Sequence, residues 1–354
     1  MYRSIQLVLS YDLIMRKFPF LTLIIFLIIV FIFSVALGAV YIPPATIFTI
    51  ILNKVSGIGI VGNWSPAFEA IILSVRLPHT VLILLTGAAL ASSGAAYQGL
   101  FRNPLSDPYL IGVASGAGLG AVIVMYLNWP QNTAGFFLIP LGAFVGAIAT
   151  VFLVYQMARV NDMVPLTTLI LAGVAIGSFA SAITSFLMLQ DDGQVYRAIS
   201  FLLGGSPIAG WDPVVACIPF MILGMVALSL SGHALNVLQF GEEQAKQLGL
   251  DVNRAKLFII TGASLTAAVA VAFSGVIGYV GLIVPHIIRI LWGPDYKRLI
   301  PLSILGGASA LLLSDLIARV LLAPSTIPVG IITAVIGTPF FLYILRRAKR
   351  EVFW

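Results

Sequence analysis

Residues 18–40 read FPFLTLIIFLIIVFIFSVALGAV, a run of 23 residues that contains no ionisable side chain. An α-helix rises 1.5 Å per residue, so about 20 apolar residues cross the roughly 30 Å hydrocarbon core of a bilayer. The run is too long for the core of a signal peptide, and no A-x-A-like cleavage site follows it. We therefore expect a retained membrane-spanning helix here.

Nine more apolar segments follow the first one. With it, they lie near residues 18–40, 79–100, 109–127, 134–157, 166–189, 214–231, 256–275, 278–292, 300–321 and 329–345. The eighth is short and is interrupted by Gly281 and Pro285. The sequence therefore predicts an all-α, polytopic transmembrane helical bundle of about ten spans. We expect a single domain over 1–354, with its membrane core at 17–346.

Composition supports this reading over that of a soluble protein. Sixty per cent of the 354 residues are hydrophobic, 9% are charged, and the mean hydropathy is +1.08. About a quarter of a soluble domain is charged, so this chain could not cover a water-facing exterior. The single Cys217 excludes an internal disulfide, and we expect it to pack as a small apolar side chain.

The positive charges predict orientation rather than nucleic-acid binding. The chain has 19 Lys and Arg against 13 Asp and Glu, and the cations form short clusters between the apolar segments. Membrane proteins concentrate Lys and Arg in their cytoplasmic loops. With the N-terminus placed in the cytoplasm, fifteen of the 19 fall on the inner side, and ten spans put both termini there.

Two connecting segments are long enough to carry structure of their own. Residues 42–52 begin with two prolines and predict a short external helix on the membrane surface, followed by a Gly-rich loop. The segment from Asp191 to Asp212 contains Gly204, Gly205 and Pro207, and we expect it to form an external, partner-facing loop.

Small residues recur at helical spacing within the spans. The third segment contains Gly112, Gly116 and Gly120 on one face, and the pairs 142/146 and 173/177 repeat the spacing. Such faces let helices approach closely in lipid. They would also form the smooth wall of a wide path for a bulky solute, and the sequence leaves both readings open.

Ionisable groups at membrane depth are few. Asp315 and Arg319 are spaced to pair on one helix, and His286 follows a proline. Proton-coupled carriers place acids or histidines at this depth, so the shortage argues against an ion-coupled secondary transporter, although a sodium site of backbone carbonyls would leave no trace. Three scattered histidines and no paired acids also argue against an intramembrane enzyme.

Energy for transport would have to come from a partner, because the chain has no G-x-x-x-x-G-K-[ST] phosphate-binding loop. The polar segment 239–249 between the sixth and seventh spans is a candidate contact for such a partner. It predicts a short helix with Phe240, Ala245 and Leu248 as apolar contacts and Gly249 as its stop, and a second helix near Asn253. A solvated connector is the alternative reading.

Five ordered strings carry a family resemblance that covers nearly the whole chain. They are RLPH at 76–79, GAALASSGAAYQ at 87–98, RNPLSDPYLIG at 102–112, GYVGLIVPHIIR at 278–289 and IPVG at 327–330. With these strings the chain resembles the permeases of type II ATP-binding-cassette (ABC) importers for ferric siderophores, haem and cobalamin.

The resemblance implies an assembly and a location. Such permeases have ten helices per subunit and form a homodimer with the pathway at its interface, in the cytoplasmic (inner) membrane of a prokaryote. Two ATPase subunits carry ATP and Mg²⁺, and an extracytoplasmic binding protein delivers the substrate for alternating access. We thus expect no catalytic residue, metal or cofactor in this chain. A ferric siderophore is our preferred substrate, although similar permeases serve haem, cobalamin or oxyanions.

The resemblance also assigns roles to residues. The coupling element at 238–256 would seat in the ATPase through Phe240, Gly241, Glu242, Glu243, Ala245, Leu248 and Gly249. Exposed docking residues for the binding protein would be Arg76, His79 and Arg319. The family usually has Arg at position 79, and a neutral His offers one donor in place of a guanidinium fork. Helix packing or the pathway would involve Gly87, Gly94, Gln98, Asn103, Pro104, Gly112, Gly116, Gly120 and Pro285.

Overall fold

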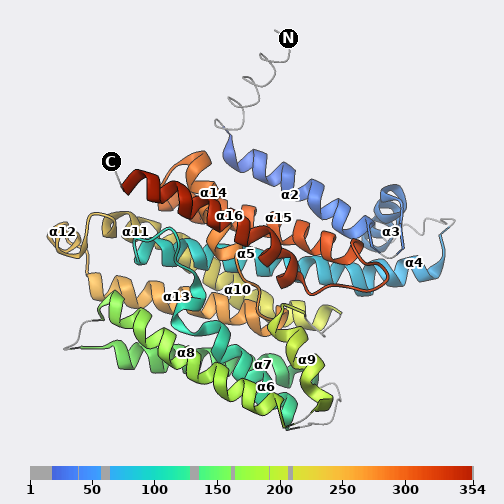
Figure 1. Ribbon diagram of the computed structural model, residues 1–354. Coiled ribbons are helices and arrows are strands. Elements are labelled where there is room, and N and C mark those ends of the chain that lie inside the picture. Colours follow the sequence, from blue (N-terminus) through green and yellow to red (C-terminus); the bar gives the residue numbers. More distant parts are fainter. Residues whose placement is uncertain are drawn as a thin grey trace.

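The computed structural model describes residues 18–38, 40–56, 64–127, 135–160, 164–190, 192–205 and 210–352. Within these ranges the regular elements are all helices (Figure 1). In chain order they are α2 (Pro19–Ala36), α3 (Pro44–Ser56), α4 (Pro66–Ala70), η1 (Ile71–Arg76), α5 (Leu77–Leu100), η2 (Pro108–Ile111), α6 (Val113–Tyr126), α7 (Gly135–Ala158), α8 (Leu166–Met188), α9 (Asp192–Leu202), α10 (Trp211–Leu230), α11 (Gly232–Leu238), α12 (Glu242–Gln247), α13 (Val252–Ser274), α14 (Val280–Trp292), α15 (Tyr296–Val320) and α16 (Val329–Val352).

The apolar segments form helices where the sequence predicted spans. Seven of the described helices are long and apolar enough to cross a membrane, and three shorter apolar ones occupy the remaining predicted segments at Val113–Tyr126, Val280–Trp292 and Val329–Ile344. The prediction of an all-α transmembrane bundle is confirmed. The second span is longer than expected, because α4, the π-helical η1 and α5 follow one another without a break from Pro66 to Leu100.

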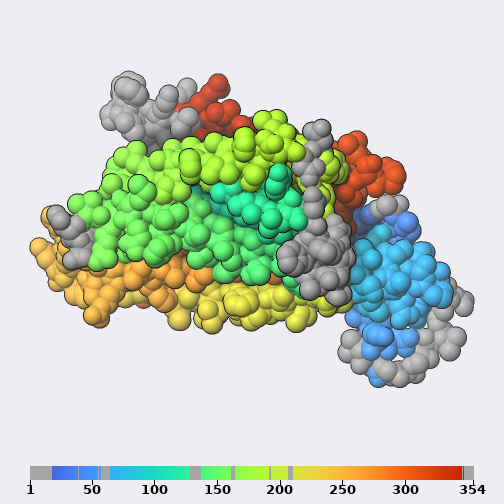
Figure 2. Space-filling model, turned by 90° about the horizontal axis from the view of Figure 1, so that it is seen from below, coloured from blue at the N-terminus to red at the C-terminus, as the bar shows by residue number. Residues whose placement is uncertain are grey.

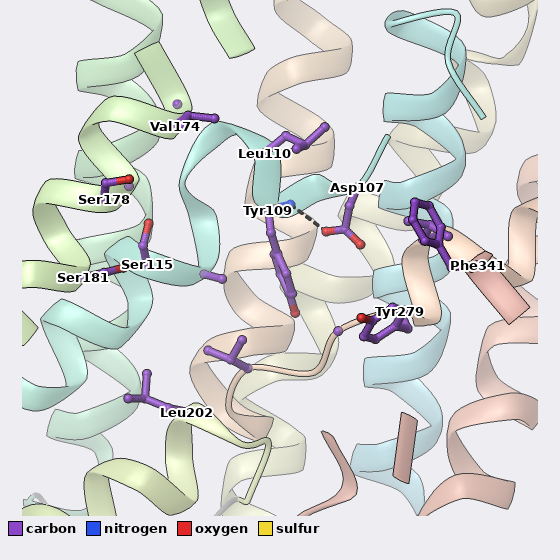
Figure 3. Close-up of a pocket in the computed structure, with 16 residues that line it drawn as sticks. Asp107, Tyr109, Leu110, Ser115, Val174, Ser178, Ser181, Leu202, Tyr279 and Phe341 are labelled. Carbon is purple, nitrogen blue, oxygen red and sulfur yellow. Dashed lines mark hydrogen bonds between the residues drawn. The ribbon is translucent and has the colours of Figure 1, made fainter. Parts of the chain in front are cut away.

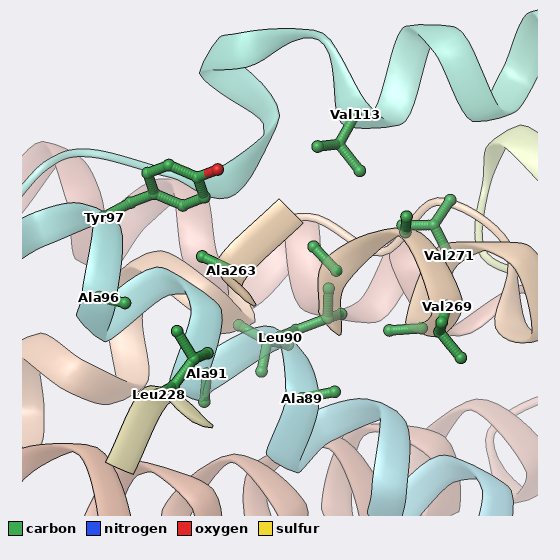
Figure 4. Close-up of a cluster of buried hydrophobic side chains, with 14 of the residues drawn as sticks. Ala89, Leu90, Ala91, Ala96, Tyr97, Val113, Leu228, Ala263, Val269 and Val271 are labelled. Carbon is green, nitrogen blue, oxygen red and sulfur yellow. The ribbon is translucent and has the colours of Figure 1, made fainter. Parts of the chain in front are cut away.

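Helix α5 is the centre of the bundle. It packs against α10, α13, α14 and α15, and every residue from Thr86 to Leu100 is buried. Figure 4 shows the contact with α13, where Leu90 lies among Ala263 and Val269. The Ala91 Cβ faces Gly307 of α15 instead. Tyr97 supplies a polar link, because its hydroxyl lies 2.7 Å from the Ser264 hydroxyl. On one face of the molecule, α7 and α8 form a broad surface with α10 and α13 along its edge (Figure 2).

Glycines set the closest helix crossings. A Cβ at Gly87 would collide with the Gly307 carbonyl oxygen, and one at Gly94 would collide with that of Gly281. Gly116 and Gly120 meet the carbonyls of Gly146 and Gly142 on α7 in the same way. In lipid, where no hydrophobic force draws apolar helices together, such contacts hold a bundle through close packing.

The segments between the spans depart from expectation at one place. The prediction of a loop over 191–212 is wrong for its first half, because Asp192–Leu202 form the helix α9. Its apolar residues recur at helical spacing, and Phe201 is buried. The helix expected at 42–52 is present as α3, whereas the Gly-rich loop expected after it lies largely outside the described residues.

Candidate functional site

Helix α12 projects from one end of the bundle, opposite the end that carries α3, α4 and α9 (Figure 1). Two glycines bracket it. Gly241 has a φ of 103° and Gly249 a φ of 85°, in the left-handed region where a side chain would be strained. The Leu250 N–H donates to the Ala245 carbonyl at 3.0 Å, which closes the turn after the helix. The sequence thus builds a short, sharply bounded helix where a stop at Gly249 was predicted.

Polar contacts fix α11 and α12 to the ends of the long helices. The Gln239 amide donates to the Gly99 carbonyl at the end of α5 (2.9 Å), and the Asn236 amide donates to Asp295 at the start of α15 (2.6 Å). The Asn236 contact, together with the Lys297 backbone N–H, holds the pKa of Asp295 below its usual value. The buried Lys256 of α13 pairs with Glu242 of α12. These contacts fix the element to the bundle, so it is not a loose connector.

The outer surface of this element presents two apolar side chains. Phe240 and Leu248 are each 66% exposed, and Glu243 beside them is also exposed. Ala245, which was expected to be a third apolar contact, is fully buried instead. Its small side chain faces the bundle, and α12 packs against the bundle through it. We call the exposed set of Phe240, Glu243 and Leu248 the α12 surface.

At the opposite end, the cations expected to face a binding protein turn inward. Arg76 is only 8% exposed, and its guanidinium donates to the carbonyls of Val35 (2.9 Å), Ala36 (3.0 Å) and Val40. The last carbonyls of a helix have no partner within it, and a cation there satisfies both their hydrogen bonds and their partial charge. The expectation of an exposed cation at Arg76 is thus corrected: Arg76 caps the end of α2.

Arg319 and His79 join the same cluster through Asp315. Arg319 Nε lies 2.8 Å from one oxygen of Asp315, as the sequence spacing predicted, and His79 Nε2 lies 2.9 Å from the other. Arg319 also donates to the carbonyl and hydroxyl oxygens of Ser34. Its side chain is only 14% exposed, against 36% for His79. The three predicted docking residues therefore lie together, and His79 is the most accessible of them.

A hollow of about 920 Å³ opens between α6, α8 and α14 (Figure 3). Its wall is made mainly of apolar side chains, glycines and hydroxyls. The lining residues are Asp107, Tyr109, Leu110, Ala114, Ser115, Gly173, Val174, Gly177, Ser178, Ser181, Leu202, Val276, Gly278, Tyr279, Leu282 and Phe341.

Two tyrosines of this wall are fixed by hydrogen bonds. The Tyr109 hydroxyl donates to the Ile277 carbonyl at 2.8 Å and accepts from the Ile277 N–H at 3.2 Å. The Tyr279 hydroxyl accepts a hydrogen bond from Thr338 of α16 at 2.8 Å. Both rings therefore hold their positions at the hollow through contacts with the connector before α14 and with α16.

The residues expected to serve packing or the pathway mostly serve packing. Besides the glycines already described, Gly112 starts α6 with a φ of 85°, and Asn103 and Pro104 are exposed in a turn where Asn103 Oδ1 accepts the Leu105 N–H. None of the nine residues borders the hollow. Gly173 and Gly177, from one of the spacing pairs, do line it.

Gln98 and Pro285 work together. Proline has no N–H, so Pro285 leaves the Gly281 carbonyl without its helical donor. The Gln98 amide donates to that carbonyl at 3.3 Å and to the Leu282 carbonyl at 3.0 Å, and its oxygen accepts from Arg289. Backbone groups at membrane depth need such internal partners. Gln98 therefore supplies the donor that Pro285 lacks for the Gly281 carbonyl of α14.

Sequence reasoning did not single out Asp107, Tyr109, Tyr279 or the serines of the hollow. Asp107 lies inside the quoted string 102–112, and Tyr279 inside 278–289, but neither spacing nor residue type distinguished them there. A lone acid beside a span was the available signal for Asp107.

Comparison with known proteins gives a consistent picture. Residues 26–347 match the FecCD transport family. A cobalamin import system permease protein of Halobacterium salinarum is 43% identical over 80% of this chain and 75% of its own, and a hemin transport system permease protein of Yersinia pestis is 40% identical over 79% and 84%. A solved structure, described as an inward-facing conformation of a metal-chelate type ABC transporter, matches with a TM-score of 0.79 and 29% identity, over 92% of this chain and 98% of that one.

These findings agree with the ten apolar helices, and the protein is a multi-pass protein of the inner membrane. The family match extends over most of the chain and includes the α12 end, the capped end of α2 and the hollow. The chain therefore belongs to the FecCD transport family.

Proposed function

We propose that this chain is the permease subunit of an ABC importer that moves a metal chelate into the cytoplasm by alternating access. The whole chain acts as one transmembrane domain, with 238–256 as the element that couples it to an ATPase. In the working complex it pairs with a second copy of itself, two ATPase subunits and an extracytoplasmic binding protein. The relatives, which are named as import and transport permeases, support this proposal.

The α12 surface is the observation that carries the coupling role. Phe240 and Leu248 are exposed on a polar element outside the apolar spans, so lipid does not account for them. The ion pair of Glu242 with the buried Lys256 and the Gln239 and Asn236 contacts tie this element to α5, α13 and α15. A partner that moves the α12 surface would therefore move the central helices.

The hollow is the proposed path for the solute. Its volume of about 920 Å³ falls in the range of about 300–1,000 Å³ for small-molecule sites, and its wall combines apolar side chains with a few polar groups. One relative is named for cobalamin and another for hemin, and the related structure is described as a metal-chelate type transporter. We take a ferric siderophore as the first substrate to test.

Docking of the binding protein is proposed at the end that carries His79. His79 is the accessible member of the cluster with Asp315 and Arg319, and Arg76 supports that surface from within. His79→Ala should therefore weaken docking of the binding protein, because it removes the accessible imidazole from that surface. Docking affinity that does not change in this variant would remove His79 from the contact.

Purification of the tagged chain from its own cells in mild detergent tests the proposal. We expect a P-loop ATPase to co-purify in equal amount. The double substitution Phe240→Ala, Leu248→Ala should remove about 2 kcal/mol of contact, which is a roughly 30-fold loss of affinity, and should release the ATPase. Replacement of Glu242–Leu248 by a Gly/Ser linker should release it completely.

Leu230→Ala is the matched control, because Leu230 is 75% exposed but lies at the end of α10, outside the α12 surface. It should leave the ATPase bound. A clean homo-oligomer without ATPase, active in ATP-free vesicles, would reject the importer and favour the ion-coupled secondary transporter.

A further inference from the structure

The hollow carries a charge of one sign. Among its sixteen lining residues, Asp107 is the single carboxylate, and none is Lys, Arg or His. No described cation lies within ion-pair distance of Asp107. Any solute in this space therefore meets an uncompensated acidic group in a largely apolar wall.

The Asp107 side chain is held in place with part of its bonding capacity free. Oδ1 accepts the backbone N–H of Tyr109 at 2.9 Å and so caps η2, and no described residue donates to Oδ2. Figure 3 shows the carboxylate on one side of the hollow with Tyr109, Tyr279 and Phe341, and Ser115, Ser178 and Ser181 on the other side. The site thus offers a fixed acceptor across from a row of hydroxyls.

This arrangement discriminates between solutes by charge. Charges interact more strongly beside an apolar wall than in water, and like charges brought together cost several kcal/mol. A polyanionic chelate or an oxyanion would meet Asp107 without a compensating cation. A neutral or cationic chelate with amide or ammonium donors would find an acceptor instead.

We propose that the hollow is a solute subsite selective for neutral or cationic metal chelates, and that Asp107 is the residue that sets this selectivity. The inference rests on the proposed function, because it assumes that the hollow carries the transported chelate. It narrows the substrate class from metal chelates in general to those without net negative charge, such as ferric trihydroxamates.

Three ferric trihydroxamate probes with one common linear ligand test the proposal at nearly constant size. The pendant amine is left free (one positive charge), acetylated (none) or succinylated (one negative charge). Equilibrium binding of each iron-labelled probe to the full chain in lipid nanodiscs should weaken in that order. We expect about tenfold or more between the first and the last.

Asp107→Asn is the decisive variant, because asparagine keeps the oxygen that caps η2 and removes only the charge. It should bring the three affinities within about twofold of one another. Asp212→Asn is the matched control: Asp212 is exposed in the first turn of α10, away from the hollow, and its loss should leave the order unchanged.

Equal affinity for the three probes, no binding of any of them, or an order that survives Asp107→Asn would overturn the inference. The measurement needs no ATPase, so its failure is separate from that of the importer. Equal affinities for the three probes, in a chain that still co-purifies with the ATPase, would reject only the charge selectivity. Affinities that fall in the expected order, in a chain that binds no ATPase, would support the subsite and reject the importer.

Discussion

At Gly94 the backbones of α5 and α14 cross so closely that a single methyl group would strike the Gly281 carbonyl oxygen. The obstacle is backbone, which cannot swing away as a flexible side chain would. The same carbonyl is already bonded to Gln98 because Pro285 cannot donate to it. The Gly281 carbonyl is thus constrained both by its close contact with Gly94 and by its hydrogen bond to Gln98.

Gly94→Ala should therefore destabilise the protein by about 3 kcal/mol, at the upper end of the usual cost of overpacking. The thermal midpoint in mild detergent, followed by tryptophan fluorescence, measures the loss. Gly262→Ala on α13 is the control, because its added Cβ would meet Leu228 at an ordinary 3.4 Å. Equal midpoints for the two variants would contradict the close crossing.

The cluster at the end of α2 leads to a second prediction at this scale. Asp315 is buried and compensates Arg319 while it contacts His79. Asp315→Asn would leave the Arg319 guanidinium without its counter-charge, at a cost of about 3 kcal/mol. We expect a lower thermal midpoint, with the exposed Asp212→Asn unchanged.

Arg76→Gln separates capping from docking in the same cluster. The cap predicts a loss of stability, because three carbonyls near the end of α2 lose the guanidinium as a donor. Weaker docking of the binding protein at unchanged stability would show that the cap is unimportant and that the guanidinium acts outward.

At the scale of elements, the ion pair between the buried Lys256 and the part-exposed Glu242 is the link between α12 and α13. Replacing Glu242 alone costs more than exchanging both residues, because it leaves the buried Lys256 charge without its partner. Glu242→Lys and Lys256→Glu should each reduce ATP-driven uptake by about tenfold or more, and the double exchange should recover part of it. Uptake that falls additively in the double variant would argue against coupling through this pair.

Elements were predictable to different degrees. The spans follow from length and hydropathy, because the bilayer requires about 20 apolar residues and internal backbone hydrogen bonds. Helix α9 was missed because its polar residues and the glycines after it are typical of a loop, although its apolar residues recur at helical spacing. The burial of Phe201 is a tertiary contact that the sequence pattern does not show.

Side-chain environments were the least predictable part of the site. Arg76 caps carbonyls about 40 residues away in the chain, and Ala245 turns toward the bundle although its neighbours Phe240 and Leu248 turn out. The Asp315–Arg319 pair was predictable because both residues lie on one helix at a spacing of four. Local spacing was therefore informative, and contacts between distant helices were not.

For the whole molecule, the proposed function depends on the two ends and the space between them. The α12 surface lies at one end and α3, α4 and α9 at the other (Figure 1), while α5 runs through the centre in contact with α10, α13, α14 and α15. Movement of α12 would be transmitted to the hollow through α13 and α14. Transport should therefore stop when the α12 surface is disabled, although that surface lies away from the hollow.

ATP-dependent uptake is the most direct test of that claim. Vesicles carrying the purified complex, with binding protein and a labelled ferric trihydroxamate outside, would be loaded with ATP or with a non-hydrolysable analogue. We predict uptake with ATP alone, no effect of collapsing proton and sodium gradients, and loss of uptake in Phe240→Ala, Leu248→Ala with Leu230→Ala intact. Uptake that continues without ATP hydrolysis and disappears with an ion gradient would contradict the account.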